Sequence, residues 1–545
     1  MKRVSGVLLV VLIVSVCWGA AHPIGNPDFG WQVALGRWIL EHAAVPAAEP
    51  FTHTARGAPM VAHQWASQVI YAAVIDGFGV TVLRFGNALL AGGAALLLFG
   101  WGRRAGASAG VALLMVVLWV LLAESRFQLR PHMWNLLLFA WAYGALFVAR
   151  PRLSIAQLVG FFGFTVVWIN LHSGVLLFAA VTGIQAVAAT FEQRVLGRLP
   201  RESDLGEGRL LRLWGLAGLV LLAVLVSPNH AQIFGYLLES GRVNADLSLE
   251  WASIASARGL STRTPGWIAL FSGLLLATVV TAYRCRREAG FASLSVVLFV
   301  ASLPFVSQRF VWTCFVPLIF VVTNLPSAKH RDVVAVAAAA GAIAWLGLGL
   351  VDAPPRLRDF RGAMFPVEAM TFLEQTQLEG RLFNSNKWGG YVLFRTGDRY
   401  PVFVDGRWVT IGEQVVRDSH AIANRRSGYD ELLDEYEIEI LLVHRGWMTE
   451  AIRVGGGWIP VFENFNSGVY LRPGPALQSN LARCSRYYAG YGVDFSRDGG
   501  FVERAAARAS PEWARSMRVQ RRHLDQFGAH GSRGLSGVVR WVAGW

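Results

Sequence analysis

The segment GVTVLRFGNALLAGGAALLLFGW occupies residues 79–101 and is followed directly by Gly102, Arg103 and Arg104. A helix needs about 20 predominantly apolar residues to cross the hydrocarbon core of a bilayer, and this run is long enough. The arginine pair after it is typical of the cytoplasmic end of a span. The segment therefore predicts a transmembrane helix that ends inside the cell.

Further apolar runs occur along most of the chain. Hydrophobic residues make up 54% of the 545 residues, and the mean hydropathy of +0.41 exceeds what soluble globular proteins usually show. We therefore predict about eleven transmembrane helices, at residues 4–22, 79–101, 106–123, 133–149, 154–171, 173–191, 212–228, 267–283, 290–306, 309–325 and 332–351. The first run could also be a secretory signal. We expect an uncleaved span there, because so many spans follow it.

Basic residues collect in every second loop between these runs, as they do in cytoplasmic loops of membrane proteins. With the N-terminus inside, the inner loops carry Arg103 and Arg104; Arg150 and Arg152; Arg194, Arg198, Arg201, Arg209 and Arg212; Arg284, Arg286 and Arg287; and Lys329 and Arg331. Eleven crossings then leave everything after residue 352 outside. We expect a multi-pass protein of a bacterial inner membrane, with a cytoplasmic N-terminus and an extracytoplasmic C-terminal domain.

The domains follow from this topology. The transmembrane region, residues 1–351, has two sizeable outer loops, 23–78 and 228–266, and helices are expected in the first loop at Trp31–His42 and Gln64–Ile75. Residues 352–475 predict a soluble α/β domain. Its expected strands are 381–383, 391–394, 402–404, 438–443 and 468–471, and its expected helices are 366–377 and 427–436. Tight turns are expected at Trp388-Gly389-Gly390-Tyr391 and at Asp405-Gly406-Arg407.

The last part of the chain, residues 476–545, is an Arg-rich tail with a peripheral helix predicted at about 499–527. Anionic lipid headgroups are its expected partner. The net charge of +14 would suggest nucleic acid if it were clustered on one soluble face, but much of it lies in short loops between apolar runs. We therefore expect membrane lipids as partners and no nucleic acid.

The four cysteines are Cys17, Cys285, Cys314 and Cys484. Their spacing is typical neither of a zinc site nor of a disulfide framework. The first outer loop also has no pair of aspartates of the kind that holds a divalent metal. We expect no cofactor, and the question of a divalent metal stays open.

Polar residues gather at the predicted outer ends of the spans, where burial is costly. They are Arg126, Arg130 and His132 after the third span, Asn170 and His172 after the fifth, Asn229 and His230 after the seventh, and Gln308 and Arg309 after the ninth. Each alone is most simply an interfacial residue. Four such junctions at one depth predict a polar cavity in the outer leaflet. Its arginines could hold the phosphate of a lipid-linked donor, because guanidinium matches phosphate oxygens in a fork.

Asp28 lies in the first outer loop, just before the helix expected at Trp31–His42. The simpler interpretation is that its carboxylate caps this helix. The alternative is a general base, which takes the proton of a hydroxyl group as that group attacks a sugar C1. Likewise, Trp65 and Trp251 either stack on sugar rings or mark the membrane interface.

Several of these segments also carry a family resemblance. In the first loop they are Asp28–His42, Val45–Thr54 and His63–Trp65; in the transmembrane region, Arg130–His132, Trp168–His172, Ser227–Asn229, Glu250–Trp251 and Arg309; and in the C-terminal domain, Phe383-Asn384, Trp388–Tyr391 and Val402–Arg407. The chain resembles, over about residues 1–475, bacterial membrane proteins of the GT-C glycosyltransferase superfamily. These proteins are related to dolichyl-phosphate-mannose protein mannosyltransferases.

The resemblance implies a GT-C-like α-helical polytopic membrane fold with a C-terminal α/β domain. It also implies a polyprenyl-phosphate sugar donor, transfer on the outer face to a glycan, lipid or protein acceptor, and an essential acidic residue in the first loop, which makes Asp28 the expected catalytic residue, acting as general base. Together with the polar junctions it makes the following residues candidates for substrate binding: Glu49, His63, Gln64, Trp65, Arg126, Arg130, His132, Asn170, His172, Asn229, His230, Glu250, Trp251 and Arg309.

The chain departs from the family pattern at two glutamines. A His often stands at the position of Gln32 and a Glu at that of Gln64, whereas Glu49 keeps the charge of the family's Asp. Two other functions therefore stay open. A transporter or flippase of a lipid-linked glycan would need polar residues through the inner half of the spans, and few are present. A non-catalytic assembly protein with a GT-C-like fold would account for the glutamines.

Overall fold

The structure is a computed structural model that describes residues 2–149, 153–197, 208–324, 331–352, 360, 364–448, 457–464, 466–492 and 495. The chain divides into two compact units. Unit 1 takes in Met1–His22 and His63–Leu357, and unit 2 takes in Pro23–Ala62 and the described residues of Arg358–Ser536. The first outer loop is therefore shared: most of it belongs to the same unit as the C-terminal domain.

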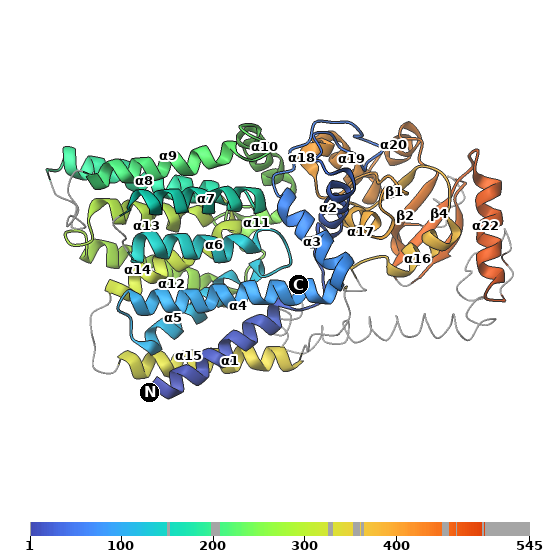
Figure 1. Cartoon of the computed structure of the whole chain (residues 1–545). Coiled ribbons are helices and arrows are strands. Elements are labelled where there is room, and N and C mark those ends of the chain that lie inside the picture. Colours follow the sequence, from blue (N-terminus) through green and yellow to red (C-terminus); the bar gives the residue numbers. More distant parts are fainter. Residues whose placement is uncertain are drawn as a thin grey trace. The chain divides into compact units, whose positions relative to one another are not determined.

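Unit 1 is a bundle of helices (Figure 1). Its long elements are α1 (Lys2–Ala20), α4 (Val80–Arg104), α5 (Ala109–Ala123), α6 (Met133–Tyr143) with the π-helical turn η2 (Gly144–Val148), α7 (Ile155–Leu171), α8 (Val175–Arg194), α9 (Gly208–Leu225), α12 (Pro265–Arg284), α13 (Phe291–Val306), η4 (Gln308–Cys314) with α14 (Phe315–Asn324), and α15 (Arg331–Asp352). Each predicted span coincides with one of these elements to within a few residues.

Shorter elements join the ends of these helices. They are α3 (Trp65–Phe78), η1 (Glu124–Arg126), α10 (Gln232–Leu247), η3 (Leu249–Trp251) and α11 (Ala257–Leu260). The predicted helix at Gln64–Ile75 corresponds to α3. The loop predicted at 228–266 folds into α10, η3 and α11, which sequence periodicity did not predict.

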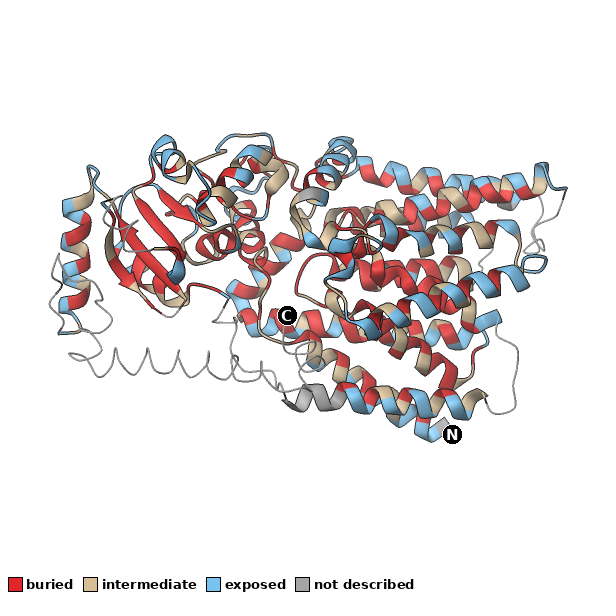
Figure 2. Cartoon of the chain, turned by 180° about the vertical axis from the view of Figure 1, so that it is seen from behind, coloured by how far each residue is buried: buried red, intermediate tan, exposed pale blue. Residues whose placement is uncertain are grey.

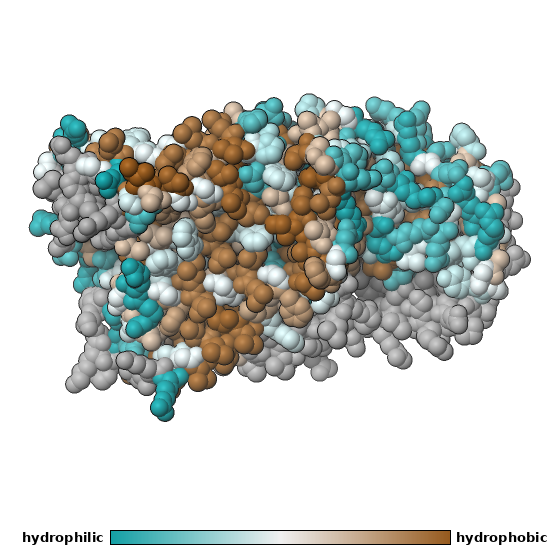
Figure 3. Space-filling view, in the orientation of Figure 1, coloured by the Kyte–Doolittle hydropathy of each residue, from teal (hydrophilic) through white to brown (hydrophobic). Residues whose placement is uncertain are grey.

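Apolar residues cover much of the face of unit 1 that Figure 3 shows. Exposed positions recur along its helices in Figure 2. Among the described residues five helices are long and apolar enough to cross a membrane: Arg3–Ala20, Val80–Arg104, Ala109–Arg126, Val175–Arg194 and Pro265–Arg284. Five shorter apolar helices accompany them, at Met133–Val148, Ile155–Leu171, Leu210–Leu225, Phe291–Val306 and Gln308–Asn324. Exposed residues such as Val10, Leu89 and Leu276 would be costly in water and are favourable against lipid. The chain is thus a multi-pass membrane protein.

An aromatic cluster forms the centre of unit 1. Phe139 of α6 lies edge-to-face against Trp168 of α7, Phe178 of α8, and Trp312 and Phe315 of the η4–α14 segment, with ring centroids 5.4 to 6.3 Å apart. Such pairs add specific orientation to the packing. This cluster packs α6, α7, α8 and the η4–α14 segment against one another.

Unit 2 is built around a four-stranded sheet of order β1-β2-β4-β3. β1 (Leu382–Asn384) pairs parallel with β2 (Ile440–His444), and β4 (Ser467–Leu471) pairs antiparallel with both β2 and β3 (Ile459–Glu463). The central strands are buried on both faces, as their continuous apolar runs require. The helices are α2 (Phe29–His42), α16 (Val367–Thr376), α17 (Asn386–Thr396), α18 (Trp408–Ile411), α19 (Glu413–Ala423), α20 (Tyr429–Glu435), η5 (Arg445–Trp447) and α22 (Leu477–Ala489).

Two predictions for residues 388–394 of unit 2 are wrong. The strand predicted at 391–394 and the turn predicted at 388–391 both lie within the helix α17. The reason is close packing against the first loop: a Cβ on Gly390 would overlap the carbonyl oxygen of Pro27, and one on Gly30 would overlap that of Gly390. The glycines therefore let two backbones touch and do not mark a turn.

The predicted strand at 402–404 is reduced to one isolated bridge between Val402 and Thr52. The structure also has β3, α18 and α19, which were not predicted. The predicted tail helix at 499–527 lies outside the described residues.

Candidate active site

Three arginines of unit 1 converge on one carboxylate. Arg126 ends η1, Arg130 precedes α6 and Arg309 lies in η4, and all three side chains reach Glu250 of η3. Arg130 Nη1 donates to Glu250 Oε2 at 2.8 Å, while Arg126 Nη1 lies 3.6 Å and Arg309 Nε 3.9 Å from the same oxygen. The structure thus brings together four of the predicted residues from three different junctions.

The cluster carries more positive than negative charge. The side chains of Arg126 and Arg130 are only 7% and 9% exposed, whereas those of Glu250 and Arg309 are 34% and 29% exposed. Within the described part of the chain, the buried Arg126 Nε has no hydrogen-bond partner. A buried guanidinium nitrogen that lacks a hydrogen-bond partner costs free energy, and an added anion that accepts from it would remove that cost.

The 3-10 helices η3 and η4 hold this cluster in place. Gln308 donates to the carbonyl oxygen of Leu249, and its own oxygen accepts hydrogen bonds from Thr262 Oγ1 and Arg263 Nε, both at 3.1 Å. The Arg309 guanidinium stacks on the Trp251 ring at 4.6 Å, which is a cation–π contact. Two residues of η4 therefore hold η3: Gln308 binds its backbone and Arg309 contacts the Trp251 side chain.

Arg263 is a neighbour of the cluster that the sequence interpretation missed. Its Nη1 donates to Ser125 Oγ at 3.4 Å, and it interacts electrostatically with Glu124 and Glu250. The available signal was its position two residues before Pro265, where α12 begins. An arginine at the start of a span on the predicted outer side breaks the alternation of basic loops.

A second polar group surrounds His172 at the end of α7. His172 Nδ1 accepts hydrogen bonds from Asn135 Nδ2 and from the Gly174 amide, both at 2.9 Å. Because Nδ1 accepts, the proton of the neutral ring is on Nε2. The sequence interpretation did not include Asn135, which also accepts from Trp168 Nε1 at 2.7 Å. The α6 and α7 ends are therefore linked by a defined hydrogen-bond chain.

His63, Gln64 and Trp65 join this group from the start of α3. The His63 ring lies 4.8 Å from the Tyr236 ring and 6.4 Å from that of His172. Gln64 donates to His63 Nε2 at 2.9 Å, and Trp65 Nε1 donates to Asn170 Oδ1 at 2.7 Å. Tyr236, on α10, was not predicted. Asn170 and Trp65 thus have a structural partnership, and their predicted contact with substrate stays a prediction.

The remaining predicted residues of unit 1 have local contacts. His132 Nε2 donates to the carbonyl oxygen of Arg126 at 2.7 Å, so it shapes the turn that carries the arginine. Asn229 bonds to Ser227 Oγ at 3.4 Å, and His230 Nδ1 donates to the carbonyl oxygen of Leu225 at 2.8 Å. These contacts stabilise the turns at the ends of the helices.

In unit 2, Asp28 stands directly before α2 but does not cap it. Its side chain makes no hydrogen bond to the helix N-terminus; instead Asp28 Oδ1 accepts from Trp31 Nε1 at 3.4 Å. A Cβ on Gly406 would overlap Asp28 Oδ1 and approach Trp31 Nε1 to 3.0 Å. The carboxylate therefore lies against the backbone of the Asp405-Gly406-Arg407 segment, and the capping interpretation is wrong.

Glu49 belongs to a buried ion cluster of unit 2. Glu49 Oε1 accepts from the amides of Phe51 and Thr52 at 2.7 and 2.8 Å. Arg407 binds Glu49 with Nη1 and Nη2, and it binds Asp405 with Nε at 3.0 Å. Burial raises the pKa of Glu49 while Arg407 opposes this; for Arg407 burial is outweighed by the two carboxylates, which raise its pKa. This geometry favours a structural role for Glu49.

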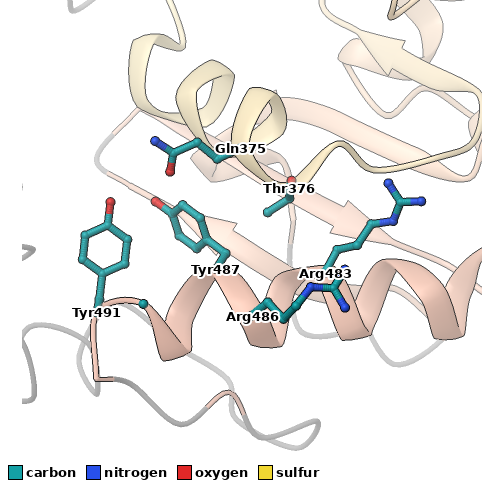
Figure 4. A pocket seen from close by; sticks show the side chains of 7 residues that line it. Gln375, Thr376, Arg483, Arg486, Tyr487 and Tyr491 are labelled. Carbon is teal, nitrogen blue, oxygen red and sulfur yellow. The ribbon is translucent and has the colours of Figure 1, made fainter.

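Unit 2 also has a pocket of about 520 Å³ (Figure 4). Gln375 and Thr376 at the end of α16 form one side, and Arg483, Arg486 and Tyr487 of α22, with Gly490 and Tyr491, form the other. The rings of Tyr487 and Tyr491 are 5.3 Å apart. None of the predicted site residues lines this pocket.

The described residues contain no group of three or more His, Cys, Asp or Glu side chains that could hold a metal ion.

The pKa of Glu250 reflects its arginine neighbours. Burial opposes its ionisation, but Arg130, Arg126 and Arg309 together hold its pKa below the ordinary range. Glu250 is therefore an anion within a cationic group.

No protein-family model and no curated protein matches the chain. Several solved structures are similar to it, among them these three. An oligosaccharyltransferase of Archaeoglobus fulgidus in the apo form has 12% identity and a TM-score of 0.50, covering 81% of this chain and 69% of that chain. The oligosaccharyltransferase AglB of the same organism, in complex with an inhibitory peptide and a dolichol-phosphate, has the same identity and TM-score and covers 80% and 69%. ArnT of Cupriavidus metallidurans, bound to undecaprenyl phosphate, has 14% identity and a TM-score of 0.43, covering 86% and 98%.

At these identities the likeness concerns the fold alone. The fold of this chain is similar to that of the two oligosaccharyltransferase structures of Archaeoglobus fulgidus. The expected fold class is confirmed in this coarse form, with many helices and a small mixed sheet in unit 2.

Proposed function

We propose that this protein is a membrane glycosyltransferase that moves a sugar from a polyprenyl-phosphate-linked donor to an acceptor on the outer face of the membrane. The observation that carries the proposal is the convergence of Arg126, Arg130 and Arg309 at the ends of apolar helices. A phosphate offers several oxygens to several guanidinium groups at once, which a single carboxylate does not.

The surroundings of the arginines favour a phosphate that carries a lipid tail. Arg126 ends the span at Ala109–Arg126, and Arg309 begins the apolar helix at Gln308–Asn324. The outer faces of such helices are apolar and suit a polyprenyl chain, while the cluster provides the charge for its headgroup. The similar structure of AglB contains a dolichol-phosphate, a ligand of this chemical class, which supports the assignment.

Asp28 is the residue that we propose as the general base. The acceptor hydroxyl oxygen attacks C1 of the sugar, the bond from C1 to the phosphate oxygen breaks, and the electron pair leaves with the lipid phosphate. The hydroxyl proton passes to the Asp28 carboxylate. Support comes from its geometry in unit 2, since its side chain does not cap α2 and is held by Trp31 instead.

The test is a transfer assay with a labelled polyprenyl-phosphate sugar and membranes that contain the full-length protein. Asp28→Asn should abolish transfer while expression and membrane insertion stay normal. The matched control is Glu41→Gln, which removes an exposed carboxylate from the same helix α2 and should leave transfer unchanged.

Full activity of the Asp28→Asn protein would overturn the role of Asp28. A wild-type protein that binds the donor without transferring its sugar would favour the flippase or the assembly protein. Movement of the labelled lipid between leaflets would then separate these two.

A further inference from the structure

Glu250 occupies the place that an anionic headgroup would take in the proposed phosphate site. Its Oε2 atom is the point on which the guanidinium groups of Arg126, Arg130 and Arg309 converge. Only Arg130 is within hydrogen-bond distance of that oxygen, at 2.8 Å, while Arg126 and Arg309 stand at 3.6 and 3.9 Å. One carboxylate oxygen therefore neutralises the cluster incompletely.

The backbone of Glu250 is anchored, but its side chain is half-open. Gln308 holds the carbonyl oxygen of Leu249, and Ser307 Oγ lies 3.5 Å from that of Glu250. The Glu250 side chain is 34% exposed, against 9% for Arg130. The carboxylate can therefore rotate away without a change in the fold of η3, whereas Arg126 and Arg130 beneath it stay buried.

The charges favour such an exchange. Three guanidinium groups face one carboxylate, and the buried Arg126 Nε has no partner among the described residues. A phosphate with two or more free oxygens would bind the same groups better than Glu250 does. Both anions at once would repel each other across a few ångströms.

We propose that Glu250 is an exchangeable counter-ion of the phosphate site. It pairs with the arginines when the site is empty, leaves them when a lipid phosphate binds, and returns as the lipid phosphate departs. Glu250 thus lowers the affinity for the lipid phosphate and speeds its release. This inference rests on the proposed function, because it assumes that the arginines bind a lipid phosphate.

The experiment measures binding of farnesyl phosphate, a short polyprenyl monophosphate, to the full-length protein in nanodiscs, with dissociation rates from competition by unlabelled lipid. Glu250→Gln keeps the shape of the side chain and removes its charge. It should tighten binding by roughly tenfold, mostly through slower dissociation. Glu239→Gln, on the exposed side of α10, is the matched control and should leave binding unchanged.

A second variant keeps the test decisive if the glutamine protein folds poorly. Glu250→Asp shortens the carboxylate and should give an affinity between those of the wild type and Glu250→Gln. Equal or weaker binding by Glu250→Gln, in protein that unfolds like the wild type, would overturn the inference and make Glu250 a residue that positions the arginines.

A separate variant tests whether the arginines bind a phosphate at all. Arg130→Gln should weaken farnesyl phosphate binding at least tenfold whatever Glu250 does. If Arg130→Gln binds as the wild type does, the proposed site is wrong; if only Glu250→Gln fails, the site stands and the exchange does not.

Discussion

The two units of the molecule each contain a cluster of arginine and carboxylate side chains, and the two clusters are built oppositely. In unit 2, Arg407 alone binds Glu49 and Asp405, and the three side chains are 5% exposed or less. In unit 1, three arginines share Glu250, and two of these four side chains are about a third exposed.

The two clusters differ in whether every charged group has a partner of opposite charge or a hydrogen bond. Glu49 also accepts two backbone amides, and Arg407 directs its guanidinium nitrogens to the two carboxylates. The cluster of unit 2 therefore consists of mutually satisfied ions, which is how a buried ionic group becomes structural. The cluster of unit 1 has an excess of positive charge, and Arg126 Nε has no hydrogen-bond partner among the described residues. The same residue types are thus arranged as a structural ion cluster in unit 2, whereas in unit 1 we propose that they bind a ligand.

The strongest test of this contrast is Arg407→Ala. It leaves two buried carboxylates without their cation, so it should destabilise unit 2 by about 3–5 kcal/mol. Pulsed alkylation of Cys484, which is fully buried in α22, reports the opening of unit 2 in the full-length protein as urea is raised.

The matched control is Arg381→Ala, because Arg381 pairs with Glu437 at 2.8 Å where both side chains are more than half exposed. Such a pair contributes about 0–1 kcal/mol. If the two variants label Cys484 at the same urea concentration, the buried cluster is not structural and the contrast fails.

The second test is Arg126→Gln in unit 1, where the opposite result is expected. Arg126 Nε has no partner in the described part of the chain, and the cluster has cations in excess, so the free energy of unfolding should change by less than about 1 kcal/mol. Binding of farnesyl phosphate should instead fall by about ten- to a hundredfold. Cys314, buried at the end of η4, reports the opening of unit 1 in the same alkylation assay. A loss of stability without a loss of binding would make this cluster structural too.

Most of unit 1 could be predicted from the sequence, because a lipid environment imposes one strong rule. A span must be long and apolar, and each interruption such as Arg103-Arg104 is easy to see. The same rule made Arg126, Arg130 and Arg309 conspicuous, since charged residues beside spans are costly. Arg263 and Tyr236 escaped because they lie between α9 and α12, where the composition is that of any polar loop.

Unit 2 was harder to predict because its elements depend on contacts between residues that are far apart in the sequence. Gly389-Gly390 suggested a turn, but these residues lie in α17, where two backbones touch and a side chain would not fit. β3 escaped because Pro460 argues against a strand, yet β3 is an edge strand and an edge tolerates proline. The partnership of Glu49 with Arg407 joins residues 358 positions apart, and a single sequence does not show such a pair.

The smallest expected effect is a change in the stability of unit 2 with pH, which comes from His53, a residue close to Glu49 in the sequence. Burial lowers the pKa of His53 below its ordinary value of 6.5, and the nearby Arg381 also lowers it. The neutral ring donates Nε2–H to the carbonyl oxygen of Leu382 at 3.1 Å. The unfolded chain therefore takes up a proton at a higher pH than the folded chain does. Stability from His53 is complete above pH 6.5 and is lost as the pH falls below it, by at most about 1.4 kcal/mol per pH unit.

His53→Gln should remove this share of the acid sensitivity of unit 2. The slope will not vanish, because burial also lowers the pKa of His420 and His444. The measurement is the urea midpoint of Cys484 alkylation between pH 7.5 and pH 5.5. It is taken as the difference between variant and wild type at each pH, so that the pH dependence of thiol reactivity cancels.

His42→Gln, at the exposed end of α2, serves as the control. If the difference in urea midpoint between His53→Gln and the wild type is the same at every pH, protonation of His53 does not affect the stability of unit 2. In unit 1, the alkylation of Cys314 should be unaffected by the substitution at every pH, since His53 belongs to unit 2.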